Sequence, residues 1–365
     1  MGFNCGIVGL PNVGKSTIFN ALTRNSAPAA NYPFCTIDPN VGIVSVPDKR
    51  LVVLTEIVPT KKVVPTILEV VDIAGLVKGA SQGEGLGNQF LSHIAEVDAL
   101  IEVVRCFEDK DVVHVSGSVD PLRDVEVILT ELILKDMEIL SKHKDRIGKA
   151  AKAGDKKAAQ VLAILERFEK GFNEAKTARQ IPLAREEEAL LQEVHFLTGK
   201  PLLYVANISE SEIGKPESAF VAAVRKKARE EGSGVIVISG KVEEDISKLE
   251  AGDREDFLKA MNLSESGLDQ LIREGHNLLS LITFFTVGET ENRAWTVHKG
   301  AFAPQAAGKI HSDFEKGFIR AEVVSYEDFV KYRGEHGARE KGKFRLEGKE
   351  YVVQDGDIMH FRFSV

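Results

Sequence analysis

Residues 9–16, GLPNVGKS, have the spacing of a phosphate-binding loop, GxxxxGK[ST]. An apolar stretch at 3–8 precedes the loop and a helical pattern at 15–24 follows it, which is the context that this motif requires. Glycines let backbone N–H groups converge on phosphate oxygens, and the helix N-terminus adds positive potential. We expect Lys15 to reach the β- and γ-phosphates and the Ser16 hydroxyl to bind Mg²⁺; an ordinary glycine-rich turn is the alternative. The predicted phosphate-contacting residues are Asn12, Val13, Gly14, Lys15, Ser16 and Thr17.

A second motif, DIAG at residues 72–75, ends the next strong apolar run and fits DxxG. Its Asp72 would hold Mg²⁺ through water, and the Gly75 N–H would sense the γ-phosphate. Thr36 lies between the two motifs in the loop YPFCTIDPN, where a threonine could complete the Mg²⁺ shell, although a lone loop threonine is usually a capping residue. A DxxG turn arises often by chance, but one about sixty residues after a phosphate loop predicts a metal site. Its ligands would be Ser16, Thr36 and Asp72.

Many GTPases place a glutamine directly after DxxG, and this chain has Leu76 there. Leucine cannot orient the attacking water, so hydrolysis should be slow, at ~10⁻⁴ to 10⁻² s⁻¹, or should use another group, a cation or a partner. Asn12 could help to hold a monovalent cation such as K⁺, but a turn-favouring asparagine fits equally well. His114 follows the apolar run at 99–107 and is a catalytic candidate, although a lone loop histidine more often lies at the surface. The predicted catalytic residues are Lys15, Thr36, Gly75 and His114.

The apolar run at 201–207 ends in NISE (207–210), at the place where a GTPase carries NKxD. In NKxD the aspartate carboxylate accepts two hydrogen bonds, from guanine N1–H and N2–H₂. Adenine can donate neither, because it has no N2 amine and its N1 is an acceptor. Glu210 is one methylene longer and Ile208 replaces the lysine, so guanine preference should be weakened, because such charge-assisted bonds are each worth ~1.5–3 kcal/mol. Asn207 can still donate to N7, which both purines share. The sequence thus predicts an altered base-reading motif.

A further loop, SGK at 239–241, follows the apolar run at 235–239 and lies where a last base-contacting loop would fall. It is also a common turn sequence. The predicted base-site residues are Asn207, Ile208, Glu210, Ser239 and Gly240.

Buried strands must position these motifs. We expect such strands in the apolar runs at 3–8, 67–73, 99–107, 201–207 and 235–239. Helical patterns separate several of them, so the alternation predicts a parallel sheet covered by helices. Residues 120–199 form a long insertion with two amphipathic helical patterns that meet at Gly154, and we expect a helical arm. From about residue 283 short alternating segments, among them YVVQ at 351–354, predict a small sheet with one clear helix at 325–332.

Composition sets further limits: 365 residues with 43% apolar and 28% charged residues predict a soluble protein of two or three domains. The net charge is −8, yet residues 141–185 hold twelve Lys or Arg against five Asp or Glu. This basic arm would suit a polyanion such as RNA, and a solvated helical hairpin is an equal alternative. Three widely spaced cysteines predict buried thiols, and we find no leader or membrane span, which favours a cytoplasmic protein.

Together these residues closely resemble the Obg-like ATPase family of the YchF type, within the translation-factor-related P-loop GTPases. The resemblance rests on long strings along the whole chain: GLPNVGKST, NYPFCTIDPN, DIAGLVKGAS, GEGLGN, RCFED, NISE and DFEKGFIRAEV with VQDGDIMHFRF near the end.

The resemblance implies an α/β fold with a P-loop GTPase-like doubly wound sheet, a helical coiled-coil insertion and a C-terminal TGS domain, which is a ubiquitin-like β-grasp unit. The expected boundaries are 1–120 with 200–280 for the OBG-type nucleotide-binding domain, 121–199 for the insertion and 281–365 for the TGS domain. It also implies ATP preferred over GTP, with Asn207 and Glu210 at the base site and a hydrophobic residue, here Leu76, in place of glutamine. Family members associate with ribosomes.

We therefore expect a Mg²⁺-dependent ATPase that hydrolyses ATP slowly, with K⁺ as a further candidate cofactor. It would act as a monomeric conformational switch on the ribosome, either the large subunit or the assembled particle, and on RNA, without a membrane. The alternatives are a GTPase with a degenerate base motif and an RNA-binding protein that nucleotide merely regulates. A metabolic phosphotransferase is disfavoured, because no acceptor site is evident.

Overall fold

The computed structural model describes residues 3–24, 40–73, 85–112 and 114–364. Contacts divide the described residues into two compact units, one within 3–43 and 69–271 and the other formed by 44–68 and 272–364. Residues 44–68, which the sequence prediction assigned to the nucleotide-binding domain, thus group with the C-terminal residues, because helix α2 packs on strand β9 there.

A sheet of β2, β4, β1, β5, β6 and β7, in that order, forms the centre of the first unit, and its pairs from β4 to β7 are parallel. Every residue of β5 is buried, as expected for a central strand covered on both faces. The predicted α/β doubly wound fold is confirmed, and the expected runs appear as strands. The strands are β1 (Asn4–Val8), β2 (Val41–Ser45), β4 (Ile67–Asp72), β5 (Ala99–Arg105), β6 (Leu202–Asn207) and β7 (Gly234–Ile238).

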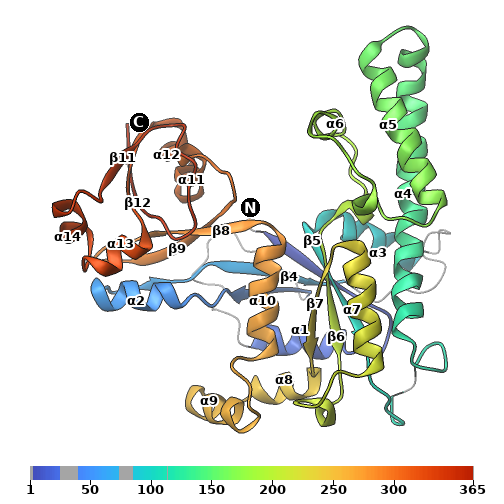
Figure 1. The fold of residues 1–365 in the computed structure, drawn as a ribbon, viewed down its shortest axis with the longest axis horizontal. Helices are drawn as coiled ribbons and strands as arrows, with labels where there is room; N and C mark the ends of the chain where they lie inside the picture. Colours follow the sequence, from blue (N-terminus) through green and yellow to red (C-terminus); the bar gives the residue numbers. More distant parts are fainter. Residues whose placement is uncertain (1–2, 25–39, 74–84, 113, 365) are drawn as a thin grey trace. The chain divides into compact units, whose positions relative to one another are not determined.

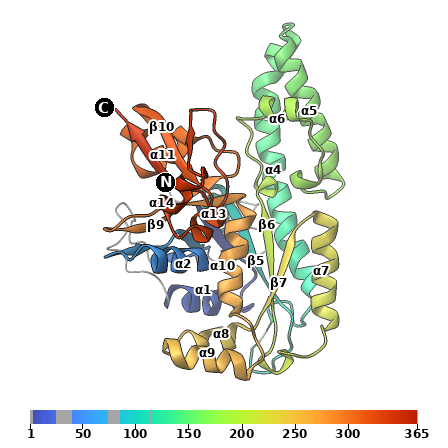
Figure 2. The ribbon, with the colours of Figure 1, turned by 60° about the vertical axis from the view of Figure 1, so that its left-hand side comes forward.

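Helices pack on both sides of this sheet. Helix α7 packs on β6 and β7 and beside α4, whereas α1 packs beside β1 and α8, and Figure 2 shows α1 and α7 on opposite sides of the strands. The helices are α1 (Lys15–Arg24), α3 (Gly85–Glu96), α4 (Pro121–Lys152), α5 (Lys156–Asn173), α6 (Arg185–Leu190), α7 (Ala219–Glu231), α8 (Gly240–Ile246), α9 (Ala251–Ala260) and α10 (Gly267–Leu278). Short 3₁₀ turns occur at η3 (Ala178–Gln180), η4 (Leu197–Gly199) and η5 (Glu210–Glu212).

Helices α4 and α5 form an antiparallel hairpin, called the arm below, which extends beyond the strands (Figure 1). The 32 residues of α4 span roughly 48 Å. Asp155 caps α5 by accepting hydrogen bonds from the N–H groups of Lys157 and Ala158, and Gly154 has a φ of +94° at the turn. Most apolar side chains of the two amphipathic patterns predicted within residues 120–199 are buried, and Leu122 is an exposed exception.

The arm has its own apolar core. Phe168 packs against Phe172 and Phe196, with ring centroids 5.9 and 4.9 Å away, and is almost fully buried. The chain that returns from the arm is held by the buried Asp136 of α4, whose carboxylate accepts hydrogen bonds from the backbone N–H groups of Leu197 and Thr198 at 2.6 and 2.9 Å. The arm therefore has a core of its own and a polar anchor at its base.

The second unit is a mixed sheet in the order β11, β10, β12, β8, β9 and β3. The central strands β8 and β12 are parallel, and each has an antiparallel neighbour, which agrees with the β-grasp expectation. The strands are β3 (Val63–Val64), β8 (Leu281–Thr286), β9 (Asn292–His298), β10 (Phe318–Val324), β11 (Arg345–Glu347) and β12 (Ile358–Phe363). The helices are α2 (Lys49–Ile57), α11 (Ala303–Ile310), α12 (Ser312–Lys316), α13 (Tyr326–Lys331) and α14 (Glu335–Glu340).

Two sequence predictions for this unit were wrong. The expected single helix at 325–332 is α13, but α11, α12 and α14 are also helical, and the expected strand YVVQ forms only an isolated bridge between Val352 and Phe302. Helix α11 was missed because its buried face consists of Ala303, Ala306 and Ala307, which give little hydrophobic periodicity. Within the described ranges, no helix has the length and apolar character needed to cross a bilayer.

The arm core gives a stability prediction. Replacing Phe168 by alanine should destabilise the arm by about 3–5 kcal/mol, because a buried aromatic ring is lost and its two neighbours are left beside a cavity. Hydrogen exchange of α4 and α5 measures the loss. The matched control is Leu134→Ala, an exposed leucine of α4, which should change stability by about 0.5 kcal/mol or less. Equal protection of α4 and α5 from hydrogen exchange in the two variants would contradict the conclusion that the arm is stabilised by its own core.

Candidate functional site

The phosphate-binding loop follows β1 and leads into α1, as the motif predicts. Gly9 and Gly14 have φ angles of +153° and +100°, and Asn12 adopts the left-handed region at 63°, which asparagine tolerates better than most residues. A Cβ atom at Gly9 would lie 2.6 Å from the Val103 carbonyl oxygen, so only glycine fits beside β5. Val13 is buried and the Ser16 side chain is exposed, which leaves the hydroxyl available to a ligand.

The Lys15 ammonium is largely buried and donates to the Leu10 carbonyl oxygen at 3.1 Å. Burial lowers the pKa of Lys15, and the nearby Asp72 carboxylate opposes that shift. Burial likewise raises the pKa of Asp72, and Lys15 lowers it. The two predicted motifs therefore meet at the end of β1 and β4, where Ile7 pairs with Asp72 in the sheet register.

This donor set suits Mg²⁺. The Asp72 Oδ1 atom is buried without a hydrogen-bond partner among the described residues, although a carboxylate oxygen in such surroundings needs a donor or a cation. Mg²⁺ prefers hydroxyl, carboxylate and phosphate oxygens, and the exposed Ser16 hydroxyl belongs to the adjoining motif. Thr36, Gly75 and Leu76, which complete the predicted switch, lie outside the described residues.

Asn207 joins the phosphate loop to the two segments that were predicted to read the base. Its Nδ2 donates to the Val13 carbonyl oxygen at 2.8 Å, and its Oδ1 accepts from the Gly240 N–H at 2.9 Å. The side chain is buried, and a Cβ atom at Gly14 would lie only 2.2 Å from Nδ2. Asn207 therefore positions three segments at once, and only its second Nδ2 hydrogen is left for a base.

The predicted base site lies at the ends of β6 and β7. The segment 239–241, expected as a loop, is instead the start of helix α8: Ser239 is its N-cap residue, and Gly240 and Lys241 are its first two residues. The Ile208 N–H donates to the Ile238 carbonyl oxygen at 2.8 Å, which joins the two strand ends. Glu210 begins the turn η5, which Ser209 and Glu212 hold in a capping box. This turn fixes the backbone of Glu210 while its side chain stays more than half exposed.

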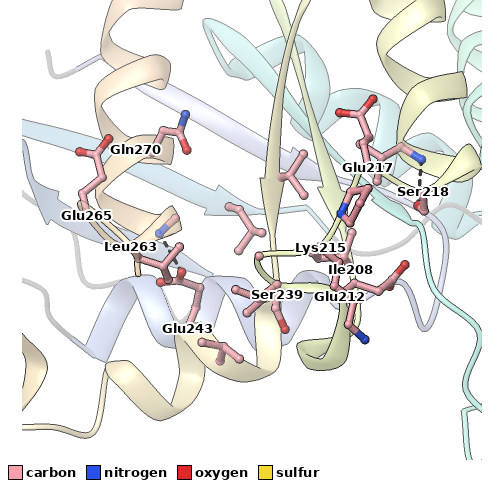
Figure 3. A pocket seen from close by; sticks show the side chains of 18 residues that line it. Ile208, Glu212, Lys215, Glu217, Ser218, Ser239, Glu243, Leu263, Glu265 and Gln270 are labelled. Carbon is pink, nitrogen blue, oxygen red and sulfur yellow. Dashed lines mark hydrogen bonds between the residues drawn. The ribbon is translucent and has the colours of Figure 1, made fainter. Parts of the chain in front are cut away.

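A cavity of about 280 Å³ opens beside these loops (Figure 3). It is lined by Ile208 and Ser239 from the two predicted base-reading segments and by Leu263 and Gln270 near the start of α10. The buried Ser239 Oγ has no hydrogen-bond partner within the described part of the chain. Two predicted base-site residues therefore line the cavity, whereas Asn207, Glu210 and Gly240 do not.

His114 does not take the position expected of a catalytic group. Its Nε2 is 2.7 Å from Asp124 Oδ2, its Nδ1 accepts from the Ser116 N–H at 3.1 Å, and its side chain is buried. Both ring nitrogens are therefore engaged within the protein at the start of α4. This geometry supports a structural role for His114 and gives no support to the predicted catalytic one.

A buried polar cluster that the sequence did not predict joins this sheet to the base of the arm. The Tyr204 hydroxyl donates to Glu231 at 3.0 Å, and Arg179 lies 3.5 Å from the same carboxylate and donates to the backbone of Thr198. Glu102 is fully buried, and burial together with Glu231 raises its pKa well above the usual range. These residues are far apart in the chain, so no local spacing could have indicated the cluster.

Arg105, at the end of β5, is another residue for which the sequence predicted no role. Its guanidinium is buried and donates to the carbonyl oxygens of Phe107, Asp109 and Val112. It therefore shapes the loop that follows β5, and the only signal for it was the string RCFED.

The fold and the phosphate loop define the class: this is a P-loop nucleotide-binding protein of the GTPase fold. Residues 4–143 match a family model described as 50S ribosome-binding GTPase, and residues 281–364 match YchF-GTPase_C, described as a protein of unknown function.

Curated relatives match over the full length. The chain is 56% identical over 366 residues to a Bacillus subtilis protein and 53% identical over 365 residues to one from Escherichia coli O157:H7, both named ribosome-binding ATPase YchF, with all of each chain covered. A solved Schizosaccharomyces pombe structure, titled YchF GTPase, is 40% identical, has a TM-score of 0.89 and covers 99% of this chain and 98% of its own. The chain belongs to the YchF family.

The Gly14 contact gives a binding prediction. Replacing Gly14 by alanine should weaken nucleotide binding about tenfold or more, because the Cβ atom meets Asn207 and φ is +100°, a strain of roughly 1–3 kcal/mol. Titration with a fluorescent nucleotide measures the effect. Gly148→Ala is the control, since a Cβ atom there has nothing within 4 Å, and it should leave binding unchanged. If the two variants bind equally well, the close approach of Asn207 is not needed.

Proposed function

We propose that this protein is a Mg²⁺-dependent ATPase that prefers ATP to GTP and acts as a nucleotide switch on the ribosome. The observation that carries the proposal is the junction at Asn207, which joins a phosphate loop to a base-reading motif, NISE, that departs from NKxD. The curated relatives carry the name ribosome-binding ATPase, which agrees with this function. The structural relative is titled a GTPase, so the choice of base is the point to test.

In this proposal Lys15 binds the β- and γ-phosphates, while Ser16, Thr36 and Asp72 hold the metal ion. When bound, Mg²⁺ neutralises the negative charge of the phosphate oxygens. The Lys15 ammonium would leave the Leu10 carbonyl oxygen to reach the nucleotide. The Gly75 N–H would sense the γ-phosphate.

Hydrolysis needs a group other than glutamine to orient the attacking water, because Leu76 follows DxxG. Leu76 cannot orient water, and His114 is engaged by Asp124, so neither supplies a general base. The expected alternatives that remain are K⁺ held near Asn12, another group of the chain and a residue of a partner. Slow hydrolysis is what a switch requires, because the ATP-bound state must persist long enough to be recognised.

In this proposal the protein binds the ribosome through a basic surface at the tip of the arm. The arm tip carries Lys149, Lys152, Lys156 and Lys157, all exposed, and Asp155, the one carboxylate between Lys149 and Lys157, is engaged in capping α5. Such a tip suits the phosphates of RNA. We further propose that the protein belongs to the Obg-like subclass, is monomeric and is cytoplasmic. Its proposed domains are 1–120 with 200–280, from which residues 44–68 depart by grouping with the C-terminal residues, then 121–199, and 281–365 as a TGS domain.

The proposed preference for ATP gives a prediction about base recognition. The wild-type protein should bind an ATP analogue more tightly than the matching GTP analogue, and the double variant Ile208→Lys with Glu210→Asp should shift this preference toward guanine. The physical reason is that aspartate restores the acceptor for guanine N1–H and N2–H₂, each bond being worth ~1.5–3 kcal/mol. Equilibrium titration of nucleotide-free protein with Mg²⁺ measures both affinities. Tighter binding of GTP by the wild type would overturn the ATPase proposal, and an unchanged double variant would mean that the base is read elsewhere.

The proposed nucleotide switch gives a prediction about ribosome binding. Sedimentation with purified ribosomes should recover different amounts of protein with a non-hydrolysable ATP analogue and with ADP. The arm-tip variant Lys149→Gln, Lys152→Gln, Lys156→Gln and Lys157→Gln should bind more weakly at low salt, because fewer counterions are released. A control with the exposed Lys248 and Lys259 changed to glutamine should bind normally.

Two outcomes would count against the switch. Equal recovery with both nucleotides contradicts it directly. RNA binding that persists when Lys15→Ala has abolished nucleotide binding would favour the alternative, an RNA-binding protein with a merely regulatory nucleotide site.

A further inference from the structure

Glu102, in the middle of β5, is a buried acid that the proposed nucleotide chemistry does not use. The residue is only 1% exposed, and neither of its carboxyl oxygens has a hydrogen-bond partner among the described residues. An ionised carboxylate without donors is costly in such surroundings, because its hydration is lost and nothing replaces it. Burial accordingly raises the pKa of Glu102 well above the usual range, and the carboxylate of Glu231 adds to the shift. Glu102 is therefore held as a neutral acid at pH values at which exposed glutamates are ionised.

Charged and polar groups on four neighbouring elements face Glu102. Both cations among them are already paired with Glu231, because Lys227 lies 3.1 Å and Arg179 lies 3.5 Å from its carboxylate oxygens. Within the described part of the chain, Glu102 is therefore left without a counterion of its own. The groups are Tyr204 of β6, Lys227 and Glu231 of α7, Arg179 of η3, and Asp124 of α4 with its partners His114 and Arg123.

Arg179 carries the complementary unpartnered group. Its Nη1 donates to the carbonyl oxygens of Thr198 and Lys200 at 2.8 and 2.9 Å, and these residues lead the chain from the arm back into β6. Its Nε is buried and makes no hydrogen bond to any residue that the structure describes. Burial has the largest effect on the pKa of Glu102, and the positive charge of Arg179 acts against it. A donor and an acid that both lack a partner therefore lie in one buried cluster.

The proton of Glu102 selects between two arrangements of Arg179. While Glu102 is neutral, the guanidinium stays beside Glu231 and on the backbone of Thr198 and Lys200. Once Glu102 is ionised, its buried carboxylate needs a charge-assisted hydrogen bond, and the Nε of Arg179 is a cationic donor that is not in use. Turning the guanidinium toward Glu102 weakens its bonds to the two backbone carbonyl oxygens.

We propose that Glu102 is a proton-linked switch at the base of the arm, which leaves Arg179 on the backbone of Thr198 and Lys200 when neutral and draws it away when ionised. Ionisation releases one proton to solvent and adds one negative charge to the cluster. The switch makes the attachment of the arm depend on pH. It goes beyond the proposed function, because it holds whichever nucleotide the protein binds.

Hydrogen exchange of the full chain, measured for peptides that cover η3 and η4, tests the switch from about pH 5 to about pH 9. After division by the intrinsic exchange rate at each pH, protection in the wild type should fall about tenfold or more across this range, since one unit of pKa shift is a tenfold change in an opening constant. The sign follows from the raised pKa of Glu102. Stability that depends on the neutral acid is complete below the pKa of the unfolded chain and is lost as the pH rises through the pKa of the folded protein.

Glu102→Gln keeps the size of the side chain and has no proton to lose. Its protection should stay near the low-pH value of the wild type, apart from the contribution of Asp136, which both proteins share and whose pKa burial raises to about 6. Glu102→Leu should behave in the same way and serves if the glutamine variant folds poorly. Glu126→Gln is the matched control, because Glu126 is an exposed glutamate of α4, and it should keep the pH dependence of the wild type.

A second measurement follows Arg179 directly. The ¹⁵N–¹H resonance of its Nε, identified by its loss in Arg179→Lys, should shift with pH in the wild type and should not shift in Glu102→Gln. A glutamate with a merely structural role would leave this resonance unchanged.

The outcomes decide the proposal. A fall of protection in the wild type that is absent from Glu102→Gln, together with a pH-dependent Arg179 resonance, supports it. The same pH dependence in both proteins overturns it. Weaker protection of Glu102→Gln at every pH would mean that Glu102 is an ionised structural partner, and an Arg179 resonance that does not move would mean that the guanidinium stays in place. Either of these results also overturns the switch.

Discussion

The amide of Asn207 is the interaction on which the site depends. It accepts a hydrogen bond from the Gly240 N–H and donates one to the Val13 carbonyl oxygen. One buried side chain therefore connects the start of α8, the end of β6 and the phosphate loop. Buried amides that are satisfied in this way hold their partners firmly, because leaving either group unpaired is costly. These two hydrogen bonds therefore fix the phosphate loop relative to the ends of β6 and β7, where the base would lie in the proposed function.

The parallel sheet makes this contact possible. Strands β1, β4, β5, β6 and β7 run in the same direction, so the segments that follow them reach one edge of the sheet. Residues separated by more than two hundred positions, such as Lys15 and Gly240, thereby serve the same nucleotide in the proposed function. The polar cluster of Glu102, Tyr204 and Glu231 lies under the same strands and connects them to the arm through Arg179.

The arm and the second unit have separate cores. The arm is held by the cluster around Phe168, and the mixed sheet packs its own buried residues, including Phe284 and Met359. Parts with separate cores can change their conformation or exposed surface while the nucleotide site stays folded. This is the property that a switch of the proposed kind would use.

The sequence by itself determined the phosphate loop, the DxxG motif, the altered NISE motif, the buried strands and the amphipathic helices of the arm. These depend on spacing within a few residues, and local geometry follows from such spacing. Short helices such as α11 escaped detection because alanine faces carry little periodic signal. Only the tertiary structure decided that Asn207 is held at both ends, that His114 is engaged by Asp124, that residues 44–68 group with the C-terminal unit and that Lys241 stands beside Glu210. Each of these contacts joins residues from different elements, and their pairing is set by strand order and packing rather than by any local pattern of residues.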